Sequence, residues 1–223
     1  MMKRLLFSAS AAALLSVACG GSDSNAVEAE VGEAVEASTA SAEGVTYSVV
    51  PASSTVLWTG SKVVGSDAHT GTIDVTDGTL IVAGDEITGG QFTIDMASLQ
   101  STDLDENSGK AKLEGHLKSD DFFKTEQYPT ATFEVVSAEP VSGQAGVTHE
   151  LVGNLTMLDV TKSITIPANV QVEGDKIMAT TPEFQINRTD WGVKYGSGIT
   201  GVAQDNMISD DVQLKIELEA ARA

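Results

Sequence analysis

The sequence predicts an all-β protein: a closed antiparallel β-barrel of about eight strands with one short helical excursion. Two observations predict the strands. Apolar and polar residues alternate with period two in many short runs, and turn-forming pairs such as Asp77-Gly78 separate these runs. A third observation concerns the helix, because helical spacing of apolar residues occurs in a single stretch. Many hairpin-connected strands with one helix favour a closed barrel over a sandwich.

Length and composition narrow the function classes. The chain has 223 residues, of which 41% are hydrophobic, so one domain with a sizeable core is expected. A formal net charge of −19 disfavours a nucleic-acid partner, since phosphate binding needs a basic stripe. One cysteine excludes an internal disulfide and a cysteine-based zinc site. Composition therefore favours a binding protein over an enzyme. No cofactor is predicted.

The first residues have the layout of a secretory signal. Lys3 and Arg4 precede an apolar run that ends at Ala18 and is too short to span a bilayer. Small residues flank Cys19, and this pattern resembles a bacterial lipobox, in which the cysteine is acylated and becomes the first mature residue. Residues 1–18 are thus predicted as a lipoprotein signal peptide, and Cys19 as a membrane anchor. The alternative is an ordinary cleaved signal with a free cysteine nearby.

Residues 19–43 are predicted as a flexible acidic linker that begins at the acylated cysteine. They consist mainly of Ala, Glu, Ser, Gly and Val and contain no aromatic residue. A short amphipathic helix over 27–37 is the alternative, although Gly32 interrupts it.

The protein would face the periplasm of a bacterial cell envelope. The absence of Asp directly after Cys19 favours the outer membrane over the inner membrane, if enterobacterial sorting applies.

The folded domain is predicted to comprise residues 44–223. Its clearest strand places Val212, Leu214, Ile216 and Leu218 on one face and polar residues on the other. The runs with strand character are, in chain order, 45–50, 55–64, 70–83, 91–96, 130–138, 150–158, 163–172, 176–181, 183–187 and 212–218. Barrel closure at about eight strands leaves room for side chains or for one small ligand.

The helical excursion is predicted between residues 109 and 123. Leu113, His116 and Leu117 recur there at i, i+3 and i+4, which is the spacing of one helix face. A Ser-Asp-Asp run then precedes an aromatic pair, and these N-cap residues predict a second short turn.

Four segments in order resemble the YceI-like family of bacterial envelope proteins over about residues 46–218. They are GHLKSDDFF at 115–123, YPTATF at 128–133, GNLTMLDVTK at 153–162 and INRTDWGV at 186–193. The resemblance implies an elongated, lipocalin-like barrel whose apolar lumen holds a polyisoprenoid chain. It also implies export, because members of the family are exported proteins.

The candidate lumen residues are the aromatic and aliphatic side chains of the strands and the helical segment. Each of them alone is also compatible with an ordinary core position. Together they supply more apolar lining than a collapsed barrel requires. The candidates are Trp58, Phe92, Ile94, Phe122, Phe123, Phe133, Val135, Leu155, Met157, Phe184, Ile186 and Trp191.

Arg188 and Asp190 are the candidates for contact with a polar lipid head. A guanidinium group matches the oxygens of a diphosphate. The alternative is an internal salt bridge between Arg188 and Asp190 that shapes the turn, because a buried arginine must be paired.

Three further motifs are interpreted as structural. The run from Gly196 to Gly201 fits the GxGxxG dinucleotide pattern, but too little chain follows it for a βαβ unit, so we expect a loop at the barrel mouth. Asp103, Asp105 and Asn107 lack the glycine and glutamate of a calcium loop, and a solvated cluster is expected. No metal site is predicted, since no histidine has a second histidine at ligand spacing: His69, His116 and His149.

These observations predict a non-catalytic carrier at the cell envelope. The barrel would sequester or carry an isoprenoid lipid, either a polyprenyl diphosphate or an isoprenoid quinone. The alternative is a structural or stress-response interaction module whose barrel is filled by its own side chains. A lipid hydrolase or isomerase is disfavoured, because the sequence has no GxSxG elbow and no clustered histidines.

Overall fold

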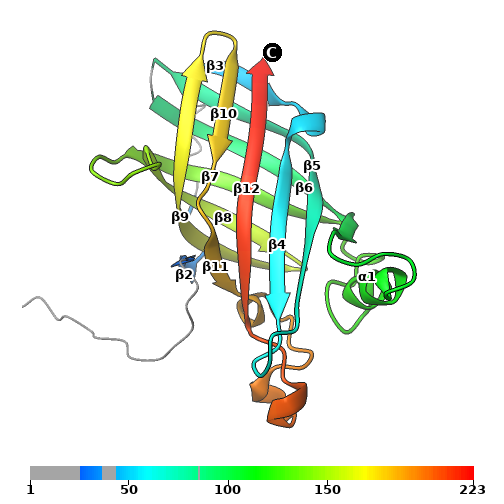
Figure 1. Cartoon of the computed structure of the whole chain (residues 1–223). Helices are drawn as coiled ribbons and strands as arrows, with labels where there is room; N and C mark the ends of the chain where they lie inside the picture. The colour runs from blue at the N-terminus through cyan, green and yellow to red at the C-terminus, as the bar shows by residue number, and fades with distance from the viewer. Residues whose placement is uncertain (1–25, 37–43, 85) are drawn as a thin grey trace, which may run out of the picture.

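The structure, a computed structural model, describes residues 26–36, 44–84 and 86–223. The predicted signal peptide and Cys19 lie outside these residues. Within them, the strands form one sheet that closes into a ring (Figure 1). The predicted all-β barrel with a single α-helix is confirmed.

The ring has eight positions among the described residues. Seven of the strands follow one another in the order β12 (Asp211–Arg222), β10 (Lys176–Thr180), β9 (Val160–Glu173), β8 (His149–Met157), β7 (Thr130–Pro140), β6 (Glu86–Ser101) and β5 (Ala68–Ala83). The last position is shared by β3 (Val45–Val49) and β4 (Thr55–Ser61), each of which pairs with both β5 and β12. β11 (Phe184–Asn187) continues the position of β10 along β12.

The barrel is elongated because two of its strands are long. β5 and β6 have sixteen residues each, which corresponds to roughly 50 Å of extended chain. Register shifts interrupt their pairing at three places, and such irregularities bend and twist long strands around a barrel. β6 extends well beyond the predicted 91–96, since pairing with β5 orders neighbouring residues that show no local alternation.

Helix α1 (Lys110–Lys118) lies at one side of the barrel (Figure 1). It starts after Gly109, whose φ of 101° is in the left-handed region. It ends at Ser119, where the backbone becomes extended, so the helix is shorter than the predicted 109–123. Leu113 and Leu117 pack against the core. Among the described residues, no helix is long and apolar enough to cross a membrane.

The N-terminal residues 27–36, here called the strap, correct the predicted linker. β1 (Val27–Glu28) pairs with β11, and β2 (Glu30–Glu33) pairs with β9. β9 pairs with β10 only over 169–173, so the strap occupies the seam where β9 and β11 separate (Figure 1). Its composition is that of a tether, but two open strand edges offer backbone partners that composition does not show.

A buried asparagine holds the end of the strap. The side-chain amide of Asn154 donates to the carbonyl of Val35 at 2.7 Å, and its Oδ1 accepts from the N–H of Val35 at 3.0 Å. Asn154 is 7% exposed. Both polar groups of a buried amide are therefore satisfied only while the strap is in place.

We expect Asn154→Ala to lower the free energy of unfolding by about 1–3 kcal/mol, because two hydrogen bonds to the strap are lost. Urea denaturation of a chain that starts at residue 20 measures the loss. Thr156→Ala is the control. Thr156 lies on β8, as Asn154 does, and the substitution removes an exposed hydroxyl pair with Thr161 of β9. Equal losses in the two variants would contradict the role given to Asn154.

Candidate functional site

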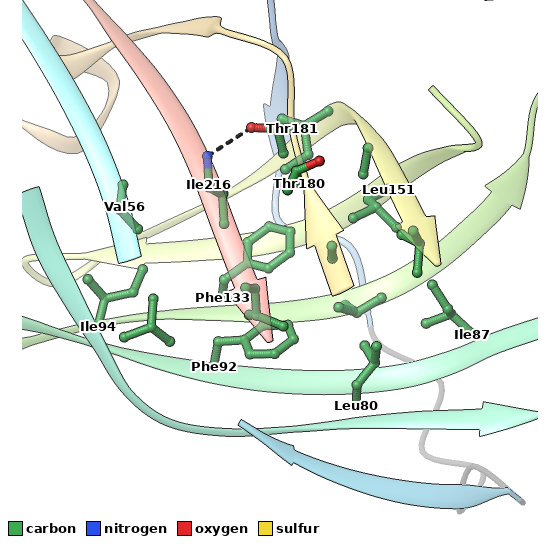
Figure 2. Close-up of a pocket in the computed structure, with 17 residues that line it drawn as sticks. Val56, Leu80, Ile87, Phe92, Ile94, Phe133, Leu151, Thr180, Thr181 and Ile216 are labelled. Carbon is green, nitrogen blue, oxygen red and sulfur yellow. Dashed lines mark hydrogen bonds between the residues drawn. The ribbon is translucent and has the colours of Figure 1, made fainter. Parts of the chain in front are cut away.

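Two apolar cavities lie one after the other along the inside of the barrel. The hairpin-end cavity, of about 70 Å³, lies toward the β9–β10 hairpin (Figure 2). The helix-end cavity, of about 140 Å³, lies toward α1. Val56 and Ile94 line both cavities, so the cavities meet at these two side chains. Together they form the lumen.

Strand β12 shows why the lumen is apolar along its length. Val212 and Leu214 line the helix-end cavity, and Ile216 and Leu218 line the hairpin-end cavity. These four side chains are the face that alternation predicts, and a strand directs every second residue to the same side. One continuous apolar face therefore runs through both cavities.

The polar side chains that line the hairpin-end cavity are Thr180 and Thr181. The hydroxyl of Thr181 accepts from the N–H of Ile216 at 2.9 Å (Figure 2), and the N–H of Thr181 donates to the carbonyl of Ile216 at 3.0 Å. These bonds replace regular pairing where β10 ends. Among the described residues, no charged side chain lines this cavity.

The structure places ten of the twelve candidate lumen residues in the cavity walls. Phe92, Phe133 and Val135 line the hairpin-end cavity, and Ile94 lines both. The helix-end cavity is lined by Trp58, Phe122, Phe123, Leu155, Met157 and Ile186. Candidates from six separate segments of the sequence thus come together.

Phe184 and Trp191 line neither cavity, which corrects their assignment. Both are essentially fully buried, and the indole N–H of Trp191 donates to the carbonyl of Leu155 at 3.0 Å. Trp191 therefore packs against the barrel wall as core. Sequence alternation shows that a side chain points inward, but not whether an open space reaches it.

Several aliphatic lining residues were not among the predicted candidates, because large aromatic side chains were favoured. Val56, Leu80, Ile87 and Leu151 line the hairpin-end cavity (Figure 2). The period-two alternation of their strands was the signal that could have found them.

Two glycines make room for aromatic rings of the lumen. A Cβ on Gly153 would clash with Cζ of Phe133, and a Cβ on Gly71 would clash with the ring of Trp58. Each glycine sits opposite its aromatic residue or beside it on the neighbouring strand, where any side chain would displace the ring. The Nε1 of Trp58 is buried and has no hydrogen-bond partner among the described residues.

Arg188 is paired, but not with the predicted residue. Its Nη2 lies 3.3 Å from Oδ1 of Asp210, and it also donates to the carbonyl of Ile208 at 3.4 Å. Nε donates to the carbonyl of Ser209 at 2.9 Å, and Nη1 donates to that of Val193 at 2.7 Å. Four of the five guanidinium N–H groups are thereby engaged.

The surroundings of Arg188 give it a structural role. Its side chain is 4% exposed, and burial lowers the pKa of the guanidinium while Asp210 opposes this shift. Arg188 is the charged residue in the wall of the helix-end cavity, yet its hydrogen bonds hold the 188–210 segment together. Among the described residues, the lumen therefore presents no cation that is free for a lipid head.

Asp190 lies away from Arg188's ion pair, in an outer groove with Glu28 and Asp211. Burial raises the pKa of Asp211, and Glu28, Asp210 and Asp190 raise it further. Four carboxyl groups therefore gather where the strap meets β11 and β12. Their mutual repulsion weakens this junction when they are ionised.

An aromatic cluster separates the helix-end cavity from the outside. Phe122 lines both this cavity and an outer groove. Its ring centroid lies 5.0 Å from that of His116 and 5.2 Å from that of Tyr195. His116 Nε2 is 3.0 Å from a carboxylate oxygen of Asp121. Phe122 is thus the partition between the lumen and the groove.

The remaining motifs have local structural roles. Asp103 accepts from the N–H of Thr70 and from Ser101, and it pairs with His69. Burial opposes ionisation of Asp103, but these bonds outweigh it and lower its pKa to about 2. Among the described residues, no group of three or more His, Cys, Asp or Glu side chains is arranged to hold a metal ion. The glycine-rich motif forms a loop with a short 3-10 turn, η3 (Gly198–Thr200), as expected.

Comparison with known proteins identifies the family. The family model of the YceI-like domain matches residues 47–220. The chain belongs to the YceI-like family. Protein YceI of Escherichia coli O157:H7 is 32% identical over 124 residues, which are 53% of this chain and 62% of that protein. A UPF0312 protein of Shewanella denitrificans is 30% identical over 142 residues, 60% of this chain and 64% of that protein. The chain therefore spans slightly less than two thirds of these YceI-like relatives.

Two solved structures share the fold. The polyisoprenoid binding domain from Saccharophagus degradans superposes with a TM-score of 0.60 at 22% identity, covering 80% of this chain and 99% of that one. BcnA of Burkholderia cenocepacia gives a TM-score of 0.57 at 21% identity, covering 78% and 99%. The elongated barrel is thus the YceI-like fold.

We expect Arg188→Lys to lower the free energy of unfolding by about 3 kcal/mol or more, because buried carbonyls lose their donors. Asp190→Asn is the matched control and should change it by less than about 0.5 kcal/mol. Thermal and urea unfolding measure both. A loss in Asp190→Asn as large as that in Arg188→Lys would instead indicate the Arg188–Asp190 pair.

The raised pKa of Asp211 predicts a pH dependence. The folded protein holds this proton more tightly than the unfolded chain, so ionised Asp211 opposes folding above its folded pKa. Asp211→Asn should therefore raise the unfolding midpoint at pH 8, and the gain should vanish as the pH falls toward 3.8. Asp159→Asn, at an exposed turn, is the control. A gain that persists at low pH would contradict this explanation.

Proposed function

We propose that this YceI-like protein is an exported, non-catalytic carrier that binds the chain of an isoprenoid lipid in its lumen. The observation that carries the proposal is the pair of apolar cavities that meet at Val56 and Ile94. The shared fold with the polyisoprenoid binding domain of Saccharophagus degradans supports it. A branched hydrocarbon chain suits this lining, since it has no polar atoms to satisfy.

Cavity size indicates how a chain would occupy the lumen. An engineered apolar cavity of ~150 Å³ in another protein stays dry and binds benzene, so the helix-end cavity, at about 140 Å³, suits a five-carbon isoprene unit. Each unit contributes about 3–4 kcal/mol at ~0.8 kcal/mol per carbon group, before ordering costs. A longer chain must pass Val56 and Ile94 to reach the second cavity. Passage between these side chains therefore controls how many units are bound.

The polar head is expected to remain at the helix end, outside the lumen. Burying a diphosphate without a free cation is costly, and Arg188 is already engaged. Lys124 and Lys194 line the groove on the outer side of Phe122. Affinity would then come from the tail, so polyprenyl diphosphates and isoprenoid quinones with equal tails bind similarly.

The proposed acyl anchor at Cys19 would keep the barrel close to the membrane. Val27, the first residue of the strap strands, follows Cys19 by eight positions. Eight residues of extended chain reach at most ~29 Å. The strap thus shortens the tether relative to the whole 19–43 segment. We place the protein on a bacterial envelope membrane, facing the periplasm.

Ile94→Trp tests the lumen, because a larger side chain at the meeting point should block passage between the cavities. We expect affinity for long isoprenoid chains to fall at least tenfold, while affinity for a chain of one or two units changes little. The affinities are measured by displacement of an apolar fluorescent dye with isoprenoids of increasing tail length. Ile94→Leu is the volume-matched control and should bind as the original chain does.

Native mass spectrometry of protein made in bacteria, followed by organic extraction, identifies the natural occupant. A copurified isoprenoid lipid supports the carrier. A protein that is empty, binds no dye and is unaffected by Ile94→Trp would instead be the structural or stress-response module with a self-filled barrel.

A further inference from the structure

Large exposed apolar side chains gather at the helix end of the barrel. Val63 is 50% exposed, Val64 44%, Tyr195 44% and Ile199 66%. We call these four residues the apolar tip. They lie on two loops, one between β4 and β5 and one that contains η3, which form the lower end of the molecule in Figure 1.

The two loops of the apolar tip are bonded together. The N–H of Val63 donates to the carbonyl of Met207 at 2.9 Å, and the N–H of Ser209 donates to that of Ser61 at 2.8 Å. The N–H of Ile208 donates to the carbonyl of Gly196 at 2.8 Å. The exposed side chains are thus presented together by an ordered backbone.

Two lysines beside the apolar tip have no ion-pair partner among the described residues. Lys124 and Lys194 line the outer groove together with Tyr195. Neither lysine forms an ion pair with a described residue, whereas the nearby Lys62 pairs with Asp67. Asp120, Asp121 and Asp205 are the nearby acids, and Asp121 pairs with His116.

Free lysines next to protruding aliphatic and tyrosine side chains fit a phospholipid surface. The lysines match the phosphate layer, tyrosine suits the interface, and the aliphatic side chains suit the acyl boundary beneath it. Protein–protein interfaces are depleted in lysine, whereas Lys124 and Lys194 border this patch.

We propose that the apolar tip docks on a lipid bilayer, with Lys124 and Lys194 facing the phosphates. The surface goes beyond the proposed lumen ligand, since docking concerns the outside of the barrel. It also continues the proposed site, because Phe122 separates the helix-end cavity from the groove that holds both lysines. Docking therefore turns the nearer end of the lumen toward the membrane.

A few aliphatic side chains give weak, reversible docking, so the test should supply a tether. The single cysteine allows the chain from residue 19 onward to be coupled at Cys19 to a maleimide-bearing lipid in phosphatidylethanolamine–phosphatidylglycerol vesicles. Tethering raises the effective concentration of the tip at the bilayer. It also removes any dependence on natural acylation.

Ile199→Trp provides the reporter. We expect its emission to shift to the blue and to lose at least half its intensity when the vesicles contain brominated acyl chains. Met178→Trp is the matched control, because Met178 is also exposed, at 41%, but belongs to β10, whose hairpin lies at the opposite end of the barrel (Figure 1). Trp58 and Trp191 are buried and give the same background in both variants.

A second substitution tests the tip itself. In the Ile199→Trp chain, the double substitution Val63→Asp and Val64→Asp should remove most of the quenching. Val172→Asp, on the opposite hairpin, should leave the quenching unchanged. Equal quenching of the two reporters, or none at position 199, would overturn the proposal. Dye binding to the untethered protein reports on the lumen separately, so loss of either property is distinguishable from loss of the other.

Discussion

The backbone pairing of β12 is the constraint on which the structure depends. β12 pairs with β10 and β11 along one side and with β3 and β4 along the other, and these ladders close the ring. Closure removes the open edges of the sheet and encloses the inward face of every strand. The apolar face of β12 then becomes one wall of both cavities, from Val212 to Leu218. Without closure there would be an apolar surface but no lumen.

The barrel is sealed at its weak points by polar groups that keep the lumen apolar. Arg188 directs its hydrogen bonds to carbonyls and to Asp210 at the helix end, and Thr181 replaces lost pairing where β10 stops. The strap covers the seam between β9 and β11, held by Asn154. In each case a polar side chain satisfies backbone groups where regular strand pairing is absent. Structural polarity in the wall thus leaves the interior suited to hydrocarbon.

The same end of the molecule combines the larger cavity, the aromatic partition and the apolar tip. Phe122 belongs to both the cavity wall and the outer groove, so a change at the surface can reach the lumen through one side chain. The acidic junction of Glu28, Asp190, Asp210 and Asp211 lies beside the strap at this end. The larger cavity, the proposed docking surface and the acidic junction thus lie close together.

The sequence by itself determined the fold class, the family and many of the side chains that point inward, because alternation, turn residues and contiguous motifs are local properties. Tertiary structure decided the features that depend on distant partners. It made strands of residues 27–33, since the edges of β9 and β11 are created by folding. It paired Arg188 with Asp210 rather than Asp190, and it left open space beside Ile94 but none beside Trp191. An edge, an ion pair across a loop and a cavity each arise from how segments far apart in sequence meet, and no local pattern encodes that meeting.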